Sequence, residues 1–180
     1  VYLDGVGDYV EFPDSPYLEL KNQDFTMEMW VNRDPKNSTS YSGLASKRAN
    51  SNIYGAFVLG LYNNSLCLWM STNGSSWQIA TNTNFVLSPS VWYHIALNRK
   101  GNTVKLFVNG VQVMSNTLTG SLVDNTAQLT VGACSADGAW DFTGYISNFR
   151  LVIGKSLYDT QFKVPASSLT AVGGTVLLAL

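Results

Sequence analysis

The sequence predicts an all-β domain in which two antiparallel sheets stack as a jelly-roll sandwich. Many short runs alternate apolar and polar residues and are separated by Gly, Asn, Ser and Pro, while no segment has a helical period. Asn109-Gly110 stands between two such runs, which is the strongest short hairpin signal. A long strand-like segment, residues 142–153, changes its apolar phase partway, as a strand that bends with a curved sheet must.

Strict alternation of side chains identifies the strands. Residues 24–33 are the clearest case, because Phe25, Met27, Met29 and Val31 would share one face and reach the core. Further strands are expected at residues 8–12, 55–62, 65–71, 76–82, 92–100, 104–115 and 128–134, with a short strand at each end of the chain. A turn at Asn63-Asn64 is expected to join the strands at residues 55–62 and 65–71.

Three longer segments lack alternation and are expected to be irregular: residues 35–42, 50–54 and 155–172. The last of these carries apolar residues, so we expect it to pack over the sandwich. No polar linker or internal repeat divides the chain, and we expect residues 1–180 to form a single domain with one core. The sequence begins at Val1 in a strand-like segment without a visible signal peptide, so we expect the domain to be part of a longer chain.

The change of phase within residues 142–153 predicts a β-bulge. Ile146 sets one apolar phase, whereas Phe149 and Leu151 require the other. One extra residue at Ser147-Asn148, in a bulge of the common type, returns all three side chains to the inward face. We therefore expect Ile146, Phe149 and Leu151 to be buried.

The composition describes a folded protein with a nearly neutral surface. Apolar residues make up 46% of the chain and charged residues 13%, the net charge is −1, and Ser, Thr and Asn together number 49. Such a surface suits an extracellular or virion protein that contacts sugars, and it argues against nucleic acid as a partner. No apolar run approaches the roughly 18 residues of a membrane span. Cys67 and Cys134 favour two buried thiols, with a disulfide as the alternative.

Four stretches of the chain carry a family resemblance: "LDGVGDYVEFPDSPYLEL", "DFTMEMWVNRD", "WYHIALNRKGNTVKLFVNGVQV" and "FTGYISNFRLVIGKSLYDTQFKVP". In this order they resemble the concanavalin A-like lectin/glucanase superfamily, in its laminin G-like branch. The closing stretch through "PASSLTAVGGTVLLAL" is similar to laminin G-like domains of bacteriophage tail fibres and other virion appendages. The resemblance implies that the first and last strands are neighbours. Ser147 stands where the family often has an Asp, so any role of that carboxylate is absent here.

The sequence offers no catalytic constellation. Glucanases of this superfamily need two carboxylates close together, roughly 5–5.5 Å apart in retaining enzymes, and Glu28 is the only acid inside a central strand. The single histidine, His94, comes without a nucleophile motif or zinc-ligand spacing. We expect both to be hydrogen-bonded structural residues and the protein not to be an enzyme.

Calcium is the metal that the sequence favours. Asp4 and Asp8 flank a Gly-Val-Gly turn, and Asp141 immediately precedes the bulged strand. Carboxylates in turns supply the hard oxygen ligands that calcium prefers. The alternative is that these residues are ordinary turn formers beside glycine.

The aromatic residues are candidates for sugar binding. Alternation through residues 55–82 places Tyr62, Trp69 and Gln78 off the core face. The non-core faces of other strands carry a second set: Glu28, Trp30, Asn32, His94 and Asn98. If these faces belong to one concave sheet, they form an aromatic groove rich in amides. The alternative is that a loop covers Trp69 and Trp30.

Loops supply the other aromatic candidates. Tyr54, Trp77 and Trp140 lie in or beside predicted loops, as does Tyr41, and exposed aromatic side chains in loops are good ligand or partner contacts. They can equally be lids over the core.

Together these observations predict a non-catalytic module of a virion appendage that recognises host-surface glycan. A structural module that contacts other virion proteins without a glycan ligand is the alternative, and a carbohydrate-active enzyme is disfavoured by the missing carboxylate pair. Resemblance to fibres implies a homo-oligomeric parent protein, expected to be a trimer, and multivalent display would raise a weak affinity by roughly 10²–10⁴.

Overall fold

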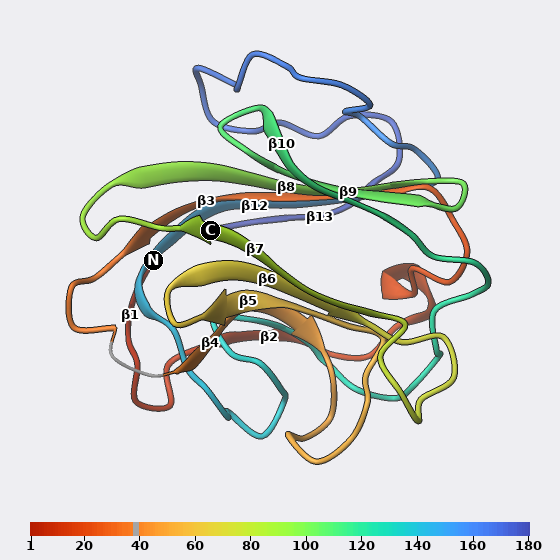
Figure 1. Ribbon diagram of the computed structural model, residues 1–180, viewed down its shortest axis with the longest axis horizontal. Coiled ribbons are helices and arrows are strands. Elements are labelled where there is room, and N and C mark those ends of the chain that lie inside the picture. The colour runs from red at the N-terminus through yellow and green to blue at the C-terminus, as the bar shows by residue number, and fades with distance from the viewer. Residues whose placement is uncertain (38–39) are drawn as a thin grey trace.

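The structure, a computed structural model, describes residues 1–37 and 40–180 and confirms the two-sheet antiparallel sandwich (Figure 1). Sheet A has seven strands: β1 (Tyr2–Asp4), β12 (Thr143–Ile153), β3 (Phe25–Arg33), β8 (Trp92–Lys100), β9 (Thr103–Val108) and β10 (Val111–Thr117) in that order, with β13 (Thr175–Ala179) also pairing with β12. Sheet B has six: β2 (Val10–Phe12), β11 (Leu129–Val131), β4 (Tyr41–Lys47), β5 (Phe57–Tyr62), β6 (Ser65–Met70) and β7 (Ile79–Val86). Among the described residues the only helix is a 3-10 turn at Pro16–Leu18, and no helix there could cross a membrane.

The core lies between the two sheets and follows the alternation of the sequence. Phe25, Met27, Met29 and Val31 are completely buried on the inner face of β3, as predicted. Burying side chains of this size stabilises the fold by roughly 1.5–3 kcal/mol each. Because the inner faces are consumed by the core, only the two outer faces of the sandwich and its loops remain for function.

The tight hairpins form at the predicted dipeptides. Asn109 and Gly110 join β9 to β10 with φ angles of 49° and 77°, and Asn63 and Asn64 join β5 to β6 with φ angles of 48° and 64°. Two consecutive left-handed residues are the mark of a type I′ turn, whose twist matches that of the strands.

The bulge in β12 is confirmed, but not its type. The register of β12 against β3 shifts by one residue between Ser147 and Arg150, and Ile146, Phe149 and Leu151 are all completely buried. Asn148 has a φ angle of 53°, whereas the common bulge that we expected has its first residue near the right-handed helical region. An asparagine tolerates the left-handed conformation better than most residues, which explains its presence at this position.

The two ends of the chain meet at this bulge. The Val1 ammonium group donates to the Ile146 carbonyl at 2.8 Å, and the Asn148 amide donates to the Leu180 carbonyl at 2.5 Å. Strands β1 and β13 therefore lie end to end along the same edge of β12 (Figure 1), which confirms that they are neighbours, although they pair with β12 and not with each other.

Strand β4 (Tyr41–Lys47) was not predicted, because residues 35–42 were expected to be irregular and no strand was expected directly after them. Its sequence, YSGLASK, has no β-branched residue and contains glycine, so local propensity argues against a strand. Pairing with β5 and β11 on its two sides overrides that propensity.

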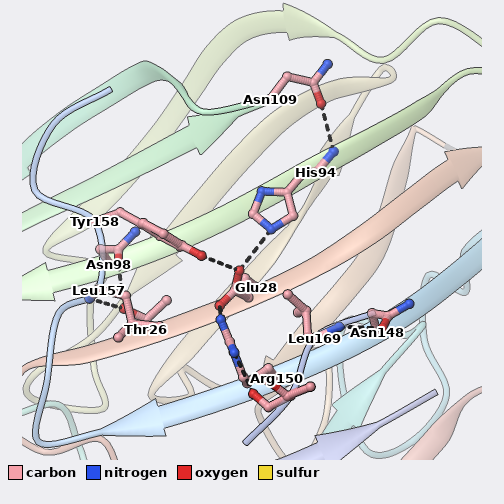
Figure 2. Close-up of polar contacts among 11 residues, drawn as sticks. Thr26, Glu28, His94, Asn98, Asn109, Asn148, Arg150, Leu157, Tyr158 and Leu169 are labelled. Carbon is pink, nitrogen blue, oxygen red and sulfur yellow. Dashed lines mark hydrogen bonds and ion pairs between the residues drawn. The ribbon is translucent and has the colours of Figure 1, made fainter. Parts of the chain in front are cut away.

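Residues 155–172 cover the outer face of sheet A, as predicted (Figure 1). Beneath them lies a buried polar network centred on Glu28, which has no exposed surface (Figure 2). One carboxylate oxygen accepts hydrogen bonds from His94 Nε2 and the Tyr158 hydroxyl, both at 2.9 Å. The other accepts from Arg150 Nε at 2.9 Å and Nη2 at 2.5 Å. Arg150 also donates to the Thr170 carbonyl at 2.6 Å, so both ends of the covering segment are held by this network.

The network keeps Glu28 charged. Burial by itself would raise the pKa of this carboxyl, but the hydrogen bonds and charges of His94 and Arg150 outweigh burial and lower the pKa below its usual value. Glu28 and His94 are thus the hydrogen-bonded structural residues that we expected.

Replacing Glu28 by Gln should destabilise the domain by about 3 kcal/mol at pH 7, because Arg150 would remain buried without its counter-charge. Since folding lowers the pKa of Glu28, its contribution to stability is present above the usual glutamate pKa of about 4.3 and is lost as the pH falls through the lower value of the folded state. The difference in unfolding free energy between wild type and Glu28→Gln should therefore shrink in acid.

Urea unfolding between pH 3 and pH 7 measures this difference, and Glu11→Gln is the matched control, because Glu11 is an exposed strand residue. A difference of less than about 0.5 kcal/mol at pH 7, within the range of ordinary surface substitutions, would show that the network does not stabilise the fold.

Candidate functional site

The outer face of sheet B carries a pocket walled by aromatic side chains, hereafter the aromatic pocket. Its volume is about 170 Å³, and its lining residues are Tyr41, Arg48, Val58, Trp69, Trp77, Cys134 and Trp140. Three of them project from strands β4, β5 and β6, and the other four come from the segments around residues 48–56, 71–78 and 132–141. The segments at residues 48–56 and 132–141 lie below sheet B in Figure 1.

Cross-strand register fixes the floor and one wall of the pocket. Val58 on β5 lies opposite Trp69 on β6, and Tyr41 on β4 lies opposite Tyr62 on β5. Side chains in such positions are direct neighbours on one face of a sheet. Because the adjacent residues of β5 and β6 face the core, these side chains must face outward.

The absence of a side chain at Gly43 lets a loop lie directly on the sheet. Gly43 pairs with Gly60 in register, and a Cβ atom on Gly43 would lie 2.0 Å from the backbone carbon of Ala133. The Gly43 amide donates to the Trp140 carbonyl at 2.8 Å. This contact seats the loop that contributes Cys134 and Trp140 to the pocket.

The aromatic rings form one continuous series of contacts across the site. Tyr41 is the centre, with ring centroids 4.8 Å from Tyr62, 5.9 Å from Trp69 and 5.3 Å from Trp140. The series continues through Arg48, whose guanidinium carbon lies 5.5 Å from the Trp140 ring and 5.6 Å from the Trp77 ring, both within range of cation–π attraction. It ends at Tyr54, which meets Trp77 edge-on at 5.1 Å.

Backbone strain marks the site. Trp140 has a φ angle of 57°, in the left-handed region that bulky residues rarely adopt. Such strain costs about 1–3 kcal/mol and collects at functional positions. Trp140 nevertheless keeps 38% of its surface exposed, so burial of the side chain does not fully account for the strained backbone.

Arg48 is fixed in place by its own loop. Its Nε donates to the Ile53 carbonyl at 2.6 Å and its Nη2 donates to the Ser51 carbonyl. Burial lowers the pKa of the guanidinium from its very high usual value, but an arginine stays protonated at neutral pH. The aromatic pocket therefore holds a permanent positive charge.

Five of the six predicted ligand residues come together here: Tyr54, Tyr62, Trp69, Trp77 and Trp140. The sixth, Gln78, does not line the pocket, because its side chain closes a loop by accepting from the Thr72 amide at 2.6 Å and donating to Ser76 Oγ at 2.8 Å. Arg48 was missed, since its role depends on the unpredicted strand β4 that precedes it. No feature of the local sequence distinguishes Arg48 from the other arginines.

The idea of a single groove is wrong. Trp69 and Tyr62 lie on sheet B, whereas Trp30 and His94 lie on sheet A, so the core separates the two sets. On sheet A, residues 155–172 also cover Glu28, His94 and Asn98, which are buried. A substrate could reach neither Glu28 nor His94 without displacing that segment.

The outer face of sheet A has its own exposed aromatic residues. Tyr2, Tyr145 and Trp92 are each more than two-fifths exposed, and Tyr145 contacts the other two with centroid distances of 4.9 and 6.2 Å. They form a row across β1, β12 and β8, and Trp92 at one end of the row also borders the covering segment, with which it lines a hollow at residues 163–168.

The two cysteines are buried free thiols, which was the favoured interpretation. Burial raises the pKa of Cys134 to about 12 and raises that of Cys67 as well, so both remain protonated and unreactive at neutral pH.

The three predicted calcium residues surround the turn at residues 4–8. Asp4 accepts from the Val6 amide and Asp141 from the Gly7 amide, both at 2.7 Å, and Asp8 accepts from the Asp4 amide at 3.2 Å. Burial, together with the neighbouring carboxylates, raises the pKa of Asp141. Within the described ranges no three His, Cys, Asp or Glu side chains form a metal-binding group, so calcium stays a prediction that requires ligands from backbone oxygens or water as well.

The comparisons with known proteins agree with this architecture. An antiparallel sandwich with an aromatic pocket on one outer face has the form of a lectin-like domain. Residues 4–155 match the laminin G group of the Concanavalin A-like lectin/glucanases superfamily, and the chain belongs to this superfamily. No curated protein matches the sequence significantly.

Solved structures share the fold at low sequence identity. A candidate carbohydrate binding protein from Bacteroides ovatus aligns with 95% of this chain and 48% of its own, at 15% identity and a TM-score of 0.72. The binding domain of Paraclostridial Mosquitocidal Protein 1 aligns with 86% of this chain and 40% of its own, at 17% identity and a TM-score of 0.65. Domain 4 of AbnA, a GH43 extracellular arabinanase from Geobacillus stearothermophilus in complex with arabinotriose, aligns with 83% and 68%, at 23% identity and a TM-score of 0.59. The chain thus spans less than half the length of the first two.

Calcium bound near Asp4, Asp8 and Asp141 should raise the melting temperature, since a ligand at 100 times its Kd stabilises the folded state by about 2.7 kcal/mol. Thermal unfolding in calcium and in EDTA measures the shift. Asp141→Asn should remove it, while Asp124→Asn, at an exposed acid elsewhere, should not. Identical melting curves of the wild type in calcium and EDTA would rule out a calcium site there.

Proposed function

We propose that this domain is a non-catalytic carbohydrate-binding module that recognises a host-surface glycan as part of a virion appendage. The observation that carries the proposal is the aromatic pocket on the outer face of sheet B. Its aromatic rings present flat apolar faces, on which the C–H faces of a sugar ring can stack. Tyr54, Tyr62 and Trp140 are each between 37% and 39% exposed, so a ligand can reach them from solvent.

The size of the aromatic pocket favours a small part of a glycan. Its 170 Å³ is less than the roughly 300–1,000 Å³ of a pocket that encloses a drug-sized ligand. It suits one terminal sugar, with Tyr54 and Tyr62 flanking it for the next units. Few fully buried contacts imply weak affinity per domain, which a homo-oligomeric fibre would offset by displaying several copies.

Two of the structurally similar proteins are connected with sugars, which supports the proposal of sugar binding. One of them was solved with arabinotriose and another is a candidate carbohydrate binding protein. The virion context rests on the similarity of the closing residues to phage appendage domains. No hydrolysis is expected, because Glu28 is the only acid inside a central strand and its oxygens are occupied by hydrogen bonds.

A second candidate function is a protein-contacting module of the virion, without a glycan ligand. The row of Tyr2, Tyr145 and Trp92 favours it, because exposed aromatic patches mark protein interfaces. This surface lies on the opposite sheet from the aromatic pocket, so single substitutions distinguish the two functions.

Trp69→Ala should abolish glycan binding while the domain still unfolds cooperatively, because Trp69 is only half-buried and lies outside the core. A glycan array with the multimerised domain, followed by titration of the ligands it identifies, measures binding, and analysis of the sugars after incubation checks that none is cleaved. Trp92→Ala is the matched control and should bind like wild type.

Loss of folding in Trp69→Ala would place Trp69 in the core and remove it from the site. Loss of binding only in Trp92→Ala would move the site to sheet A. Absence of any glycan ligand for the multimerised wild type would favour the protein-contacting module.

A further inference from the structure

The aromatic pocket contains one charged group, the guanidinium of Arg48. Arg48 is only 8% exposed and lies between the rings of Trp77 and Trp140. Burying a cation is costly unless its charge and its N–H groups are satisfied. The partners of Arg48 are therefore informative.

The protein supplies hydrogen-bond acceptors to only some of the N–H groups of Arg48. Nε and Nη2 donate to the carbonyls of Ile53 and Ser51, whereas Nη1 makes no hydrogen bond with the described residues. No carboxylate of these residues lies within 4 Å of the guanidinium. Asp137 attracts Arg48 from a longer distance, but its oxygens already accept from the Ser51 amide and from Ser135.

Three other buried cations of the domain are better satisfied, whereas Arg33 also leaves one nitrogen, Nη2, without a hydrogen bond to the described residues but does not line the aromatic pocket. Lys47 has carboxylate oxygens of Asp14 and Glu19 at 2.7 and 2.8 Å, and Arg150 has Glu28. Arg99, which lacks a carboxylate partner, donates from all three of its nitrogens to backbone carbonyls. Arg48 differs from these three because a charge and an unused donor remain beside a pocket.

We propose that the aromatic pocket selects a sugar that carries a carboxylate, and that Arg48 binds that carboxylate through Nη1 while the sugar ring stacks on the surrounding aromatic rings. This inference rests on the proposed function and names its ligand class: glycans ending in a uronic acid or in a sialic acid. A guanidinium suits this partner, because its N–H groups match carboxylate oxygens and such charge-assisted bonds are about twice as strong as neutral ones.

The surroundings of Arg48 strengthen such a contact. Between two indole rings, and largely out of water, a charge pair is screened less than at an open surface. The preference for acidic sugars would come from Arg48 itself, because the net charge of the chain is −1 and gives no general attraction for anions.

The test compares multivalent conjugates that display glucuronic acid, the methyl ester of glucuronic acid, glucose or N-acetylneuraminic acid. The ester keeps the ring and removes the charge. We expect the wild type to bind at least one of the two acids about tenfold more tightly than glucose and, where that acid is glucuronic acid, than its ester, the effect of roughly one charge-assisted hydrogen bond. Arg48→Gln should lose this preference, and Lys36→Gln, at an exposed lysine, should keep it.

If Arg48→Gln fails to fold, Arg48→Lys tests the same contact, because lysine keeps the positive charge but not the guanidinium geometry. We expect Arg48→Lys to have a reduced preference for the acidic sugar. Equal binding of acidic and neutral sugars by the wild type would overturn this inference and leave the proposed function in place. So would an undiminished preference in folded Arg48→Gln. Failure of every glycan to bind would remove the proposed function and this inference together.

Discussion

The direct contact between the backbone of the loop at residues 132–141 and Gly43 is the constraint on which the site depends. It requires a glycine in a central strand, where glycine is otherwise unfavourable. It places Cys134 and Trp140 on sheet B and leaves Trp140 in a strained backbone conformation. Tyr41 and Arg48 contact Trp140, and Arg48 also contacts Trp77. The aromatic pocket is therefore formed without a ligand, which would lower the entropic cost of binding one.

The two outer faces of the sandwich are used differently. On sheet A the buried ion pair of Glu28 and Arg150 holds residues 155–172 over part of the sheet and covers Glu28, His94 and Asn98. On sheet B the loops surround the face without closing it, so aromatic side chains stay within reach of solvent. An outward-facing side chain is therefore buried where residues 155–172 cover the sheet and exposed where no segment covers it.

Much of the fold followed from the sequence because it is encoded locally. Alternation identified the strands, Asn-Gly and Asn-Asn the hairpins, and the phase of Ile146 and Phe149 the bulge. Alternation also turned Trp69 and Tyr62 away from the core, but it could not say to which sheet each strand belongs, so Trp30 was wrongly grouped with them. Strand β4 and Arg48 escaped prediction because they depend on tertiary pairing and on loop packing, which leave no local signal.

The central claim is that the aromatic residues of sheet B are displayed for binding and do not act as lids over the core. Denaturant unfolding of Trp140→Gly tests it most directly. A displayed Trp140 contacts Tyr41 and Arg48 but not the core. Glycine would relieve a left-handed strain of about 1–2 kcal/mol, which offsets the lost contacts, so the unfolding free energy should stay close to that of the wild type. A lid over the core would lose about 3–5 kcal/mol, as large aromatic side chains do when they are truncated, and a loss of that size would contradict the account.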